Sequence, residues 1–149
     1  MTVETRAASH AESLEPLRDE RDLEVQAFFD RYAEALTMGD VVEIVACWNV
    51  PAFVLADQGA RAITSTEEIE RFFARTKEYY NARGVYDTKA VIDDIVWLTP
   101  RIASVDVHWP WYGPRGEDRG EECSSYLLRI DDDDNLRLHA AVMCGADER

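Results

Sequence analysis

The sequence predicts an α+β fold in which three helices pack on a curved antiparallel sheet. Apolar residues recur at helical spacing in the first half of the chain, and they alternate with polar residues in the second half. Helices segregated from antiparallel strands are typical of this class. A chain of 149 residues suffices for one domain with a core. We therefore expect a flexible tail over 1–19, one domain over 20–145 and a flexible C-terminus over 146–149.

Charge and composition exclude several classes of function. The net charge of −14 repels nucleic acids and anionic lipids. No apolar run approaches the roughly 18 residues that a membrane span needs. Cys47, Cys123 and Cys144 are odd in number and form no C-x-x-C motif, and no signal peptide precedes them, which indicates reduced thiols. We expect an acidic cytoplasmic protein that binds neither nucleic acid nor a membrane.

Two helices are predicted first. The apolar stripe of the first helix consists of Val25, Phe28, Phe29, Tyr32, Ala35 and Leu36. Gly39 ends this helix, because glycine adopts the left-handed conformation at low cost. Asp40 and Glu43 have the spacing of a capping box and start the second helix, whose apolar side includes Trp48. This helix ends before Pro51.

A short hairpin and a third helix follow. We expect strands over 52–56 and 61–64, joined by a turn at 57–59. Ser65 is the predicted N-cap of the third helix, with Glu68 reaching back to it. The buried stripe of this helix is Ile69, Phe72, Phe73, Thr76 and Tyr80.

Four long strands complete the chain. The first covers about 85–98 and presents Val91, Ile95 and Trp97 on one face. Turns at 113–116 and 131–135 separate the other three. Their largely apolar faces are Val105, Val107, Trp109 and Trp111; Ser124, Tyr126, Leu128 and Ile130; and Leu136, Leu138, Ala140 and Val142. One face of the sheet therefore lies on a core.

No cofactor or metal is expected. The acidic turn at 131–134 lacks the glycine at loop position six of a calcium loop, and Val142 stands where that loop has glutamate. The three histidines have no zinc-site spacing. The sequence contains no G-x-G-x-x-G, Walker A or G-x-S-x-G motif. We interpret 131–134 as a solvated hairpin turn.

This order of elements resembles the NTF2-like superfamily, which includes SnoaL-like polyketide cyclases and ketosteroid isomerases. The resemblance rests on Phe29–Tyr32, Met38–Asp40, Ile44–Trp48, Thr66–Phe73 and the acidic hairpin before Leu136, and it covers Asp22 to Cys144. It implies a cone-shaped α+β barrel with an apolar pocket. It also implies a homodimer formed through the outer face of the sheet.

The resemblance to ketosteroid isomerases implies catalytic candidates. Their first-helix tyrosine, an oxyanion donor, falls on Tyr32, and their neutral aspartic acid donor falls on Tyr126. Their general-base aspartate falls on Ala56, with Asp57 one residue later. A shift of one residue in a strand turns the side chain to the other face, so Asp57 must curl inward beyond the strand's end. Two core tyrosines with satisfied hydroxyls fit the same pattern.

Other residues complete the predicted site. The expected ligand-binding wall is Trp48, Phe53, Phe73, Trp97 and Trp109, although ordinary core or interface packing also explains the tryptophans. Glu122 shares the face of Tyr126 and points either into the cone mouth or into solvent. Asp106, His108 and His139 share the opposite face, where they form a surface or interface network. They become the catalytic candidates if the faces are reversed.

Two functional hypotheses follow. The first is a SnoaL-like protein whose pocket takes a small hydrophobic or aromatic ligand, either as a binding protein or as a cofactor-free isomerase, cyclase or dehydratase. Asp57, Glu122 or the pair of Asp106 and His108 would then supply the base. The alternative is a non-catalytic dimeric protein-interaction module. A ligand-sized void inside the cone distinguishes the two.

Overall fold

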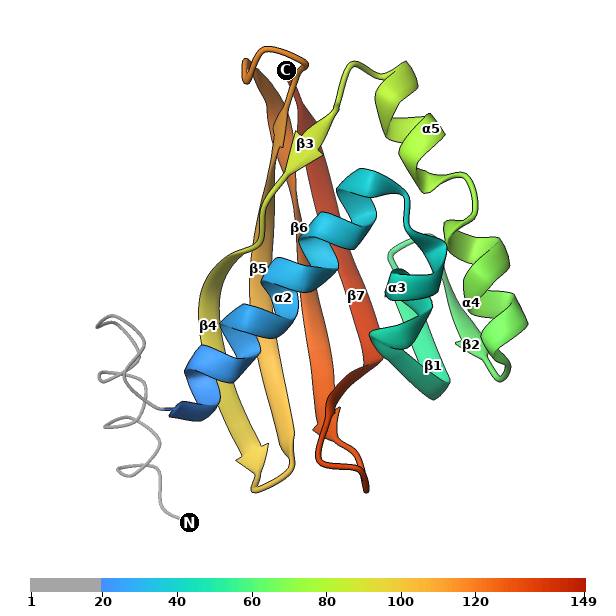
Figure 1. Ribbon diagram of the computed structural model, residues 1–149, viewed down its shortest axis with the longest axis vertical. Coiled ribbons are helices and arrows are strands. Elements are labelled where there is room, and N and C mark those ends of the chain that lie inside the picture. The colour runs from blue at the N-terminus through green and yellow to red at the C-terminus, as the bar shows by residue number, and fades with distance from the viewer. Residues whose placement is uncertain (1–19) are drawn as a thin grey trace.

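A computed structural model describes residues 20–149, so the tail expected over 1–19 lies outside the described residues. The elements are α2 (Glu20–Met38), α3 (Val41–Ala46), β1 (Trp48–Ala56), β2 (Gly59–Ile63), α4 (Thr66–Phe73), α5 (Thr76–Ala82), β3 (Asp87–Thr88), β4 (Val91–Thr99), β5 (Ile102–Tyr112), β6 (Asp118–Ile130) and β7 (Leu136–Glu148). Helix α2 lies across one face of the sheet, α3 and α4 lie beside β1 and β2, and α5 lies toward the end of the sheet where the C-terminus is marked (Figure 1). The α+β class is confirmed.

The sheet has seven strands in the order β2-β1-β7-β6-β5-β3, and β4 also pairs with β5. It is mixed, not wholly antiparallel as predicted. Strand β1 runs parallel to β7, with Phe53 opposite Ala140 and Leu55 opposite Val142. The first strand of the chain, β1, lies beside the last strand, β7, and the two run in the same direction. The edge strands β2 and β3 do not pair with each other, so the curved sheet stays open.

The predicted helix boundaries are largely confirmed. Gly39 ends α2 with a φ of +68°. The Asp40 carboxylate accepts a hydrogen bond from the Glu43 backbone N–H, and the Ser65 hydroxyl accepts one from that of Glu68. The predicted third helix is broken after Phe73 into α4 and α5. No residue of α5 is buried, so this helix is only partly covered by the rest of the domain.

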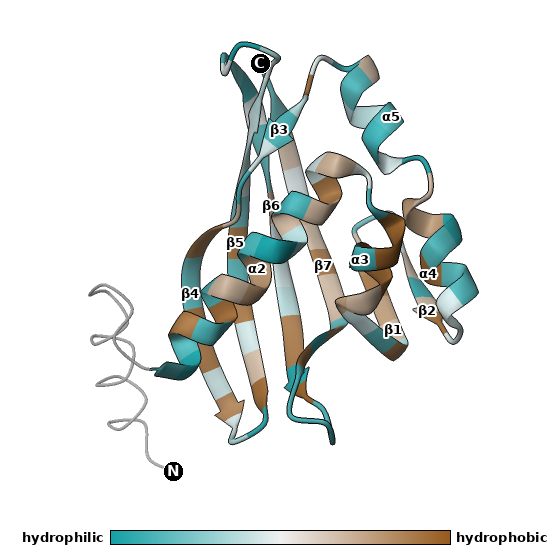
Figure 2. Ribbon diagram, viewed as in Figure 1, coloured by the Kyte–Doolittle hydropathy of each residue, from teal (hydrophilic) through white to brown (hydrophobic). Residues whose placement is uncertain are grey.

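The core lies between α2 and the inner faces of β5 and β6. Its α2 side consists of Val25, Phe28, Phe29, Tyr32, Ala33 and Ala35. On the sheet, Val105, Val107 and Trp109 are almost fully buried, as their alternation predicts. Brown and teal segments alternate along these elements in Figure 2, in line with one apolar and one polar face. The prediction of a half-buried sheet is therefore confirmed.

Two β-bulges change which residues face the core. In β4, a bulge between Ile92 and Asp94 brings Ile92 onto the core, where the sequence predicted Val91. In β7, Leu127 pairs with Ala140 and Leu128 with Leu138, which leaves His139 as an extra residue. Beyond that point Ala141 is buried and Val142 is 43% exposed. The predicted inward positions of Ala140 and Val142 are wrong for this reason.

Three boundaries also differ from the prediction. The expected strand over 85–98 is two strands, β3 and β4, which pair with different parts of β5. Trp48 starts β1 and does not end the second helix. Strand β7 continues to Glu148, which pairs with Gly120, so 146–148 belong to the sheet. The flexible C-terminus expected over 146–149 is thereby corrected.

Candidate functional site

A cavity of about 420 Å³ lies between α2, α5 and the inner face of the sheet. Its walls are rich in aromatic side chains, which include Tyr32, Trp48, Phe73, Tyr80, Trp109 and Trp111. This volume lies within the usual range of small-molecule pockets, and a mostly apolar lining with few polar groups is typical of them. The cavity is therefore the candidate functional site.

Tyr32 and Tyr126 place two hydroxyl groups in the cavity wall. Both side chains are at least nine-tenths buried, and their ring centroids are 6.5 Å apart. Trp48 Nε1 donates to Tyr32 Oη at 3.2 Å, and Trp109 Nε1 donates to Tyr126 Oη, also at 3.2 Å. Each indole occupies one lone pair of a phenol oxygen and leaves the phenol hydrogen available to donate.

Both phenols stay protonated near neutral pH. Burial raises the pKa of Tyr32 well above its ordinary value, and the nearby Tyr126 ring adds to this effect. Burial likewise raises the pKa of Tyr126, against the hydrogen bonds from Ser124 and Trp109. The pair therefore acts as two neutral hydrogen-bond donors, suited to a carbonyl, hydroxyl or developing oxyanion of a ligand.

A third polar feature pairs α5 with β6. Tyr80 Oη donates to Glu122 Oε1 at 2.9 Å, and Oε2 is 3.2 Å away. Burial raises the pKa of Glu122, although hydrogen bonds from Tyr80 and Trp111 oppose this. Glu122 lines the cavity and is therefore not the solvated alternative. Asp87 also lines the cavity, but its side chain is exposed.

Three other predicted site residues lie outside the cavity. Asp57 is exposed in the turn between β1 and β2 and does not curl inward. Phe53 is 49% exposed on the outer face of β1, because Ala52 and Val54 take the inner face. Trp97 donates from Nε1 to Asp22 at 3.2 Å, on the edge strand β4. Trp48, Phe73 and Trp109 do line the cavity, as expected.

The predicted network of Asp106, His108 and His139 does not form. His108 Nδ1 lies 2.9 Å from Asp93, the residue that the β4 bulge leaves unpaired. Asp106 accepts a hydrogen bond from the Ser125 hydroxyl at 2.7 Å. Both lie on the outer face, as the alternation predicts, and neither lines the cavity. They are therefore not placed to act on a ligand inside the cone.

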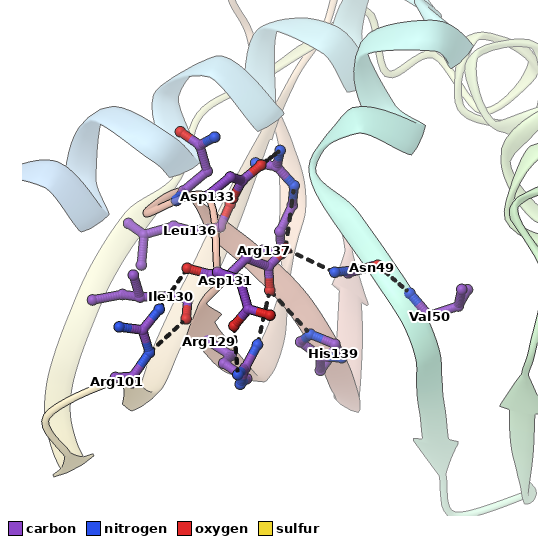
Figure 3. A network of polar contacts seen from close by, with 12 residues as sticks. Asn49, Val50, Arg101, Arg129, Ile130, Asp131, Asp133, Leu136, Arg137 and His139 are labelled. Atoms are coloured by element: carbon purple, nitrogen blue, oxygen red, sulfur yellow. Dashed lines mark hydrogen bonds and ion pairs between the residues drawn. The ribbon is translucent and has the colours of Figure 1, made fainter.

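His139 belongs to a different cluster, centred on Asp131 (Figure 3). Its Nδ1 lies 2.9 Å from the Pro51 carbonyl, and its Nε2 lies 3.8 Å from the Asp131 carboxylate. Asn49 Nδ2 donates to Asp131 at 2.7 Å, and Arg129 approaches it at 3.2 Å. Asp131 is buried, unlike the solvated turn that the sequence predicts. The cluster ties β1 to the β6–β7 turn and thus has a structural role.

Tyr80 is the main site residue that the sequence analysis missed. It was expected only as part of the buried stripe of the third helix, and Thr76 of that stripe lines the cavity as well. The sequence signal was the pair of hydroxyl-bearing residues, Thr76 and Tyr80, at the end of an otherwise apolar helical stripe.

Among residues 20–149, no three His, Cys, Asp or Glu side chains gather as a metal site. In the same range, no helix combines the length and apolar character that crossing a membrane requires.

Solved structures with the same fold are numerous. An NTF-2 like protein of unknown function from Shewanella oneidensis superposes with a TM-score of 0.66 at 16% identity, over 84% of this chain and 99% of its own. A ketosteroid isomerase-like protein from Erwinia carotovora gives 0.64 at 15% identity, over 85% and 97%. A putative aromatic ring hydroxylase from Novosphingobium aromaticivorans gives 0.61 at 12% identity, over 90% and 96%.

At these identities the likeness is one of fold, and fold alone does not define function. No curated protein matches the sequence. The profile of a family described as NTF2-like protein (DUF6841) matches residues 19–146, which is most of the chain. The resemblance stated from the sequence is confirmed, and the chain belongs to this NTF2-like family.

Proposed function

We propose that this protein binds a small hydrophobic or aromatic molecule in the cavity and holds the molecule's polar group with Tyr32 and Tyr126. The observation that carries the proposal is the pair of buried phenols, each with its oxygen held by an indole N–H at the cavity wall. The aromatic walls contact the apolar body of the ligand, and the two phenols fix its orientation by hydrogen bonds to its polar group. A ligand-sized cavity favours this function over a non-catalytic protein-interaction module.

If the bound molecule is also converted, cofactor-free acid–base chemistry fits the cavity best. Glu122 is the candidate base, because burial raises its pKa toward the range in which a carboxylate transfers protons efficiently. The phenols would stabilise charge that develops on a ligand oxygen. Isomerisation, cyclisation and dehydration all need only such groups. We also propose that the protein acts in the cytoplasm, because its three cysteines are odd in number and form no C-x-x-C motif.

The double variant Tyr32→Phe/Tyr126→Phe tests the role of the phenols. Naphthol and naphthalene serve as probes that differ by one hydroxyl group, and calorimetry measures their binding. We expect the double variant to bind naphthol roughly thirtyfold more weakly, since each of the two lost hydrogen bonds costs about 1 kcal/mol. Naphthalene affinity should stay the same, because the aromatic walls are retained.

The matched control is Tyr112→Phe, which removes a phenol that does not line the cavity. This variant should bind both probes as the unaltered protein does. Equal loss of naphthol and naphthalene in the double variant would indicate damage to the cavity and not loss of a specific hydrogen bond. Unchanged naphthol binding would refute the proposed role of the two tyrosines.

We also propose that two copies associate through the outer face of the sheet. An exposed apolar patch crosses three neighbouring strands there, and it comprises Phe53, Leu55, Leu127 and Val142. The strand register makes it contiguous, because Ala140 lies between Phe53 and Leu127. A contiguous exposed apolar patch is typical of a protein–protein contact, and a second copy offers the same patch in return.

Phe53→Asp tests this association by light scattering coupled to gel filtration. A carboxylate buried in an apolar contact costs several kcal/mol, so we expect the dimer dissociation constant to rise by roughly 100-fold or more. Val42→Asp, at an exposed position of α3, is the charge-matched control and should leave the dimer intact. A monomeric unaltered protein at high concentration would rule out the association.

A further inference from the structure

We infer that the ligand of this cavity carries a protonated amine, and that Glu122 is its counter-ion. This inference rests on the function proposed above and adds the chemical class of the ligand. It follows from a partly buried carboxylate that forms no ion pair among the described residues, from the aromatic rings around it, and from the positions of the cations that line the cavity.

Glu122 has no cationic partner among the described residues. Among residues 20–149, Glu122 forms no ion pair, and its recorded hydrogen bonds come from the neutral side chains of Tyr80 and Trp111. Elsewhere in this acidic chain, carboxylates that are withdrawn from water do have cations. Asp131, for example, is approached by both Arg129 and Arg137. A carboxylate in an aromatic cavity is costly without such a partner.

Aromatic rings surround the Glu122 carboxylate. Tyr80 and Trp111 meet edge to face, with ring centroids 5.6 Å apart and an interplanar angle of 61°. Trp109 lies directly opposite Glu122 in the β5–β6 register. A carboxylate among indole and phenol rings combines an ion pair with cation–π contacts, which together recognise substituted ammonium groups. A neutral or anionic group would gain from neither interaction.

Two cationic side chains line the cavity without pairing with Glu122. Arg75 and Lys77 line the cavity, but Arg75 is paired with Glu78 at 3.1 Å and is largely exposed. The stem of Lys77 packs beside Gly39. Among residues 20–149, neither Arg75 nor Lys77 forms an ion pair with Glu122. The rim cations therefore do not neutralise the carboxylate, and the ammonium position remains for a ligand.

The ligand that fits these features is an amphiphilic amine. Its oxygen-bearing end would lie at Tyr32 and Tyr126, its apolar body against the aromatic walls, and its ammonium group at Glu122. The net charge of −14 also favours the approach of cations over anions. No bond is made or broken in this recognition step.

The test compares naphthylethylamine with naphthylethanol, which share an apolar body and differ in charge. Calorimetry near neutral pH should show the amine bound roughly tenfold to a hundredfold more tightly than the alcohol, as for a hydrogen bond to a charged group. Glu122→Gln should abolish this preference, because the amide carries no charge to attract the ammonium group. Glu121→Gln removes the same charge from the opposite face of β6 and should retain the preference.

The outcomes separate the two proposals. Equal binding of amine and alcohol by the unaltered protein would overturn the amine inference and leave the proposed pocket function standing. A preference that survives in Glu122→Gln would also overturn it, because attraction by the overall charge would then suffice. Binding of neither probe, nor of naphthol, would overturn the pocket function itself. Alcohol binding by Glu122→Gln shows that this variant is folded.

Discussion

Replacing Phe29 by alanine is expected to lower the free energy of unfolding by about 3–5 kcal/mol, the usual loss for a buried phenylalanine. Phe29 is fully buried at the centre of an aromatic cluster. Its ring centroid lies 5.1 Å from that of Tyr126 and 6.4 Å from those of Tyr32 and Trp109. The variant loses these contacts and leaves a void that the rigid helix α2 cannot close.

Urea denaturation followed by tryptophan fluorescence measures this loss. Phe72→Ala is the matched control, because the same side chain is 38% exposed on α4. We expect the control to lose about 1 kcal/mol or less, as is usual for partly exposed positions. A comparable loss in both variants would show that the aromatic cluster does not dominate the stability of the domain.

Replacing Gly120 by alanine is the second change with a large expected effect. Gly120 has a φ of +110°, and an added Cβ would clash with the Asp147 carbonyl oxygen of β7. Both the strained backbone and this clash with neighbouring backbone must be relieved, so we expect a loss of roughly 3 kcal/mol. The β6–β7 pairing would shift near Glu122, and the amine preference should weaken along with the stability.

Gly116→Ala separates strain from clash. Gly116 also has a positive φ, +81°, but an added Cβ would meet no atom within 4 Å. This control carries only the conformational cost, about 1 kcal/mol. Thermal unfolding of the two variants checks the difference. Similar melting temperatures would mean that β7 moves away easily, and that the close approach at Gly120 is unimportant.

The sequence predicts those parts of the fold that local rules control. Asp40 and Ser65 cap helices as their spacing indicates, and the alternation in β5 gives the right faces because no bulge interrupts the inward residues. The β7 faces could not be predicted past His139. One extra residue there has no local signature, yet it exchanges the two faces until a second extra residue, Cys144, interrupts the pairing again.

The site was predictable where strand alternation was followed consistently. Glu122 shares its face with Tyr126, and both line the cavity. Phe53 was misplaced because its size suggested a core position, although alignment of Ala56 with a pocket position already implied that Phe53 faces outward. Tyr80 depends on a long-range contact with β6 that appears only once the third helix is broken. Such tertiary contacts leave little trace in local periodicity.

The weak attachment of α5 has a kinetic consequence. With no buried residue, α5 is held by few contacts, among them the Tyr80–Glu122 hydrogen bond and the ion pair of Arg83 with Glu148 at 2.8 Å. Segments of this kind open locally at a small fraction of the global unfolding free energy. Entry to the cavity would then be paced by this opening, and a ligand seated at Glu122 would in turn slow the amide exchange of 76–82.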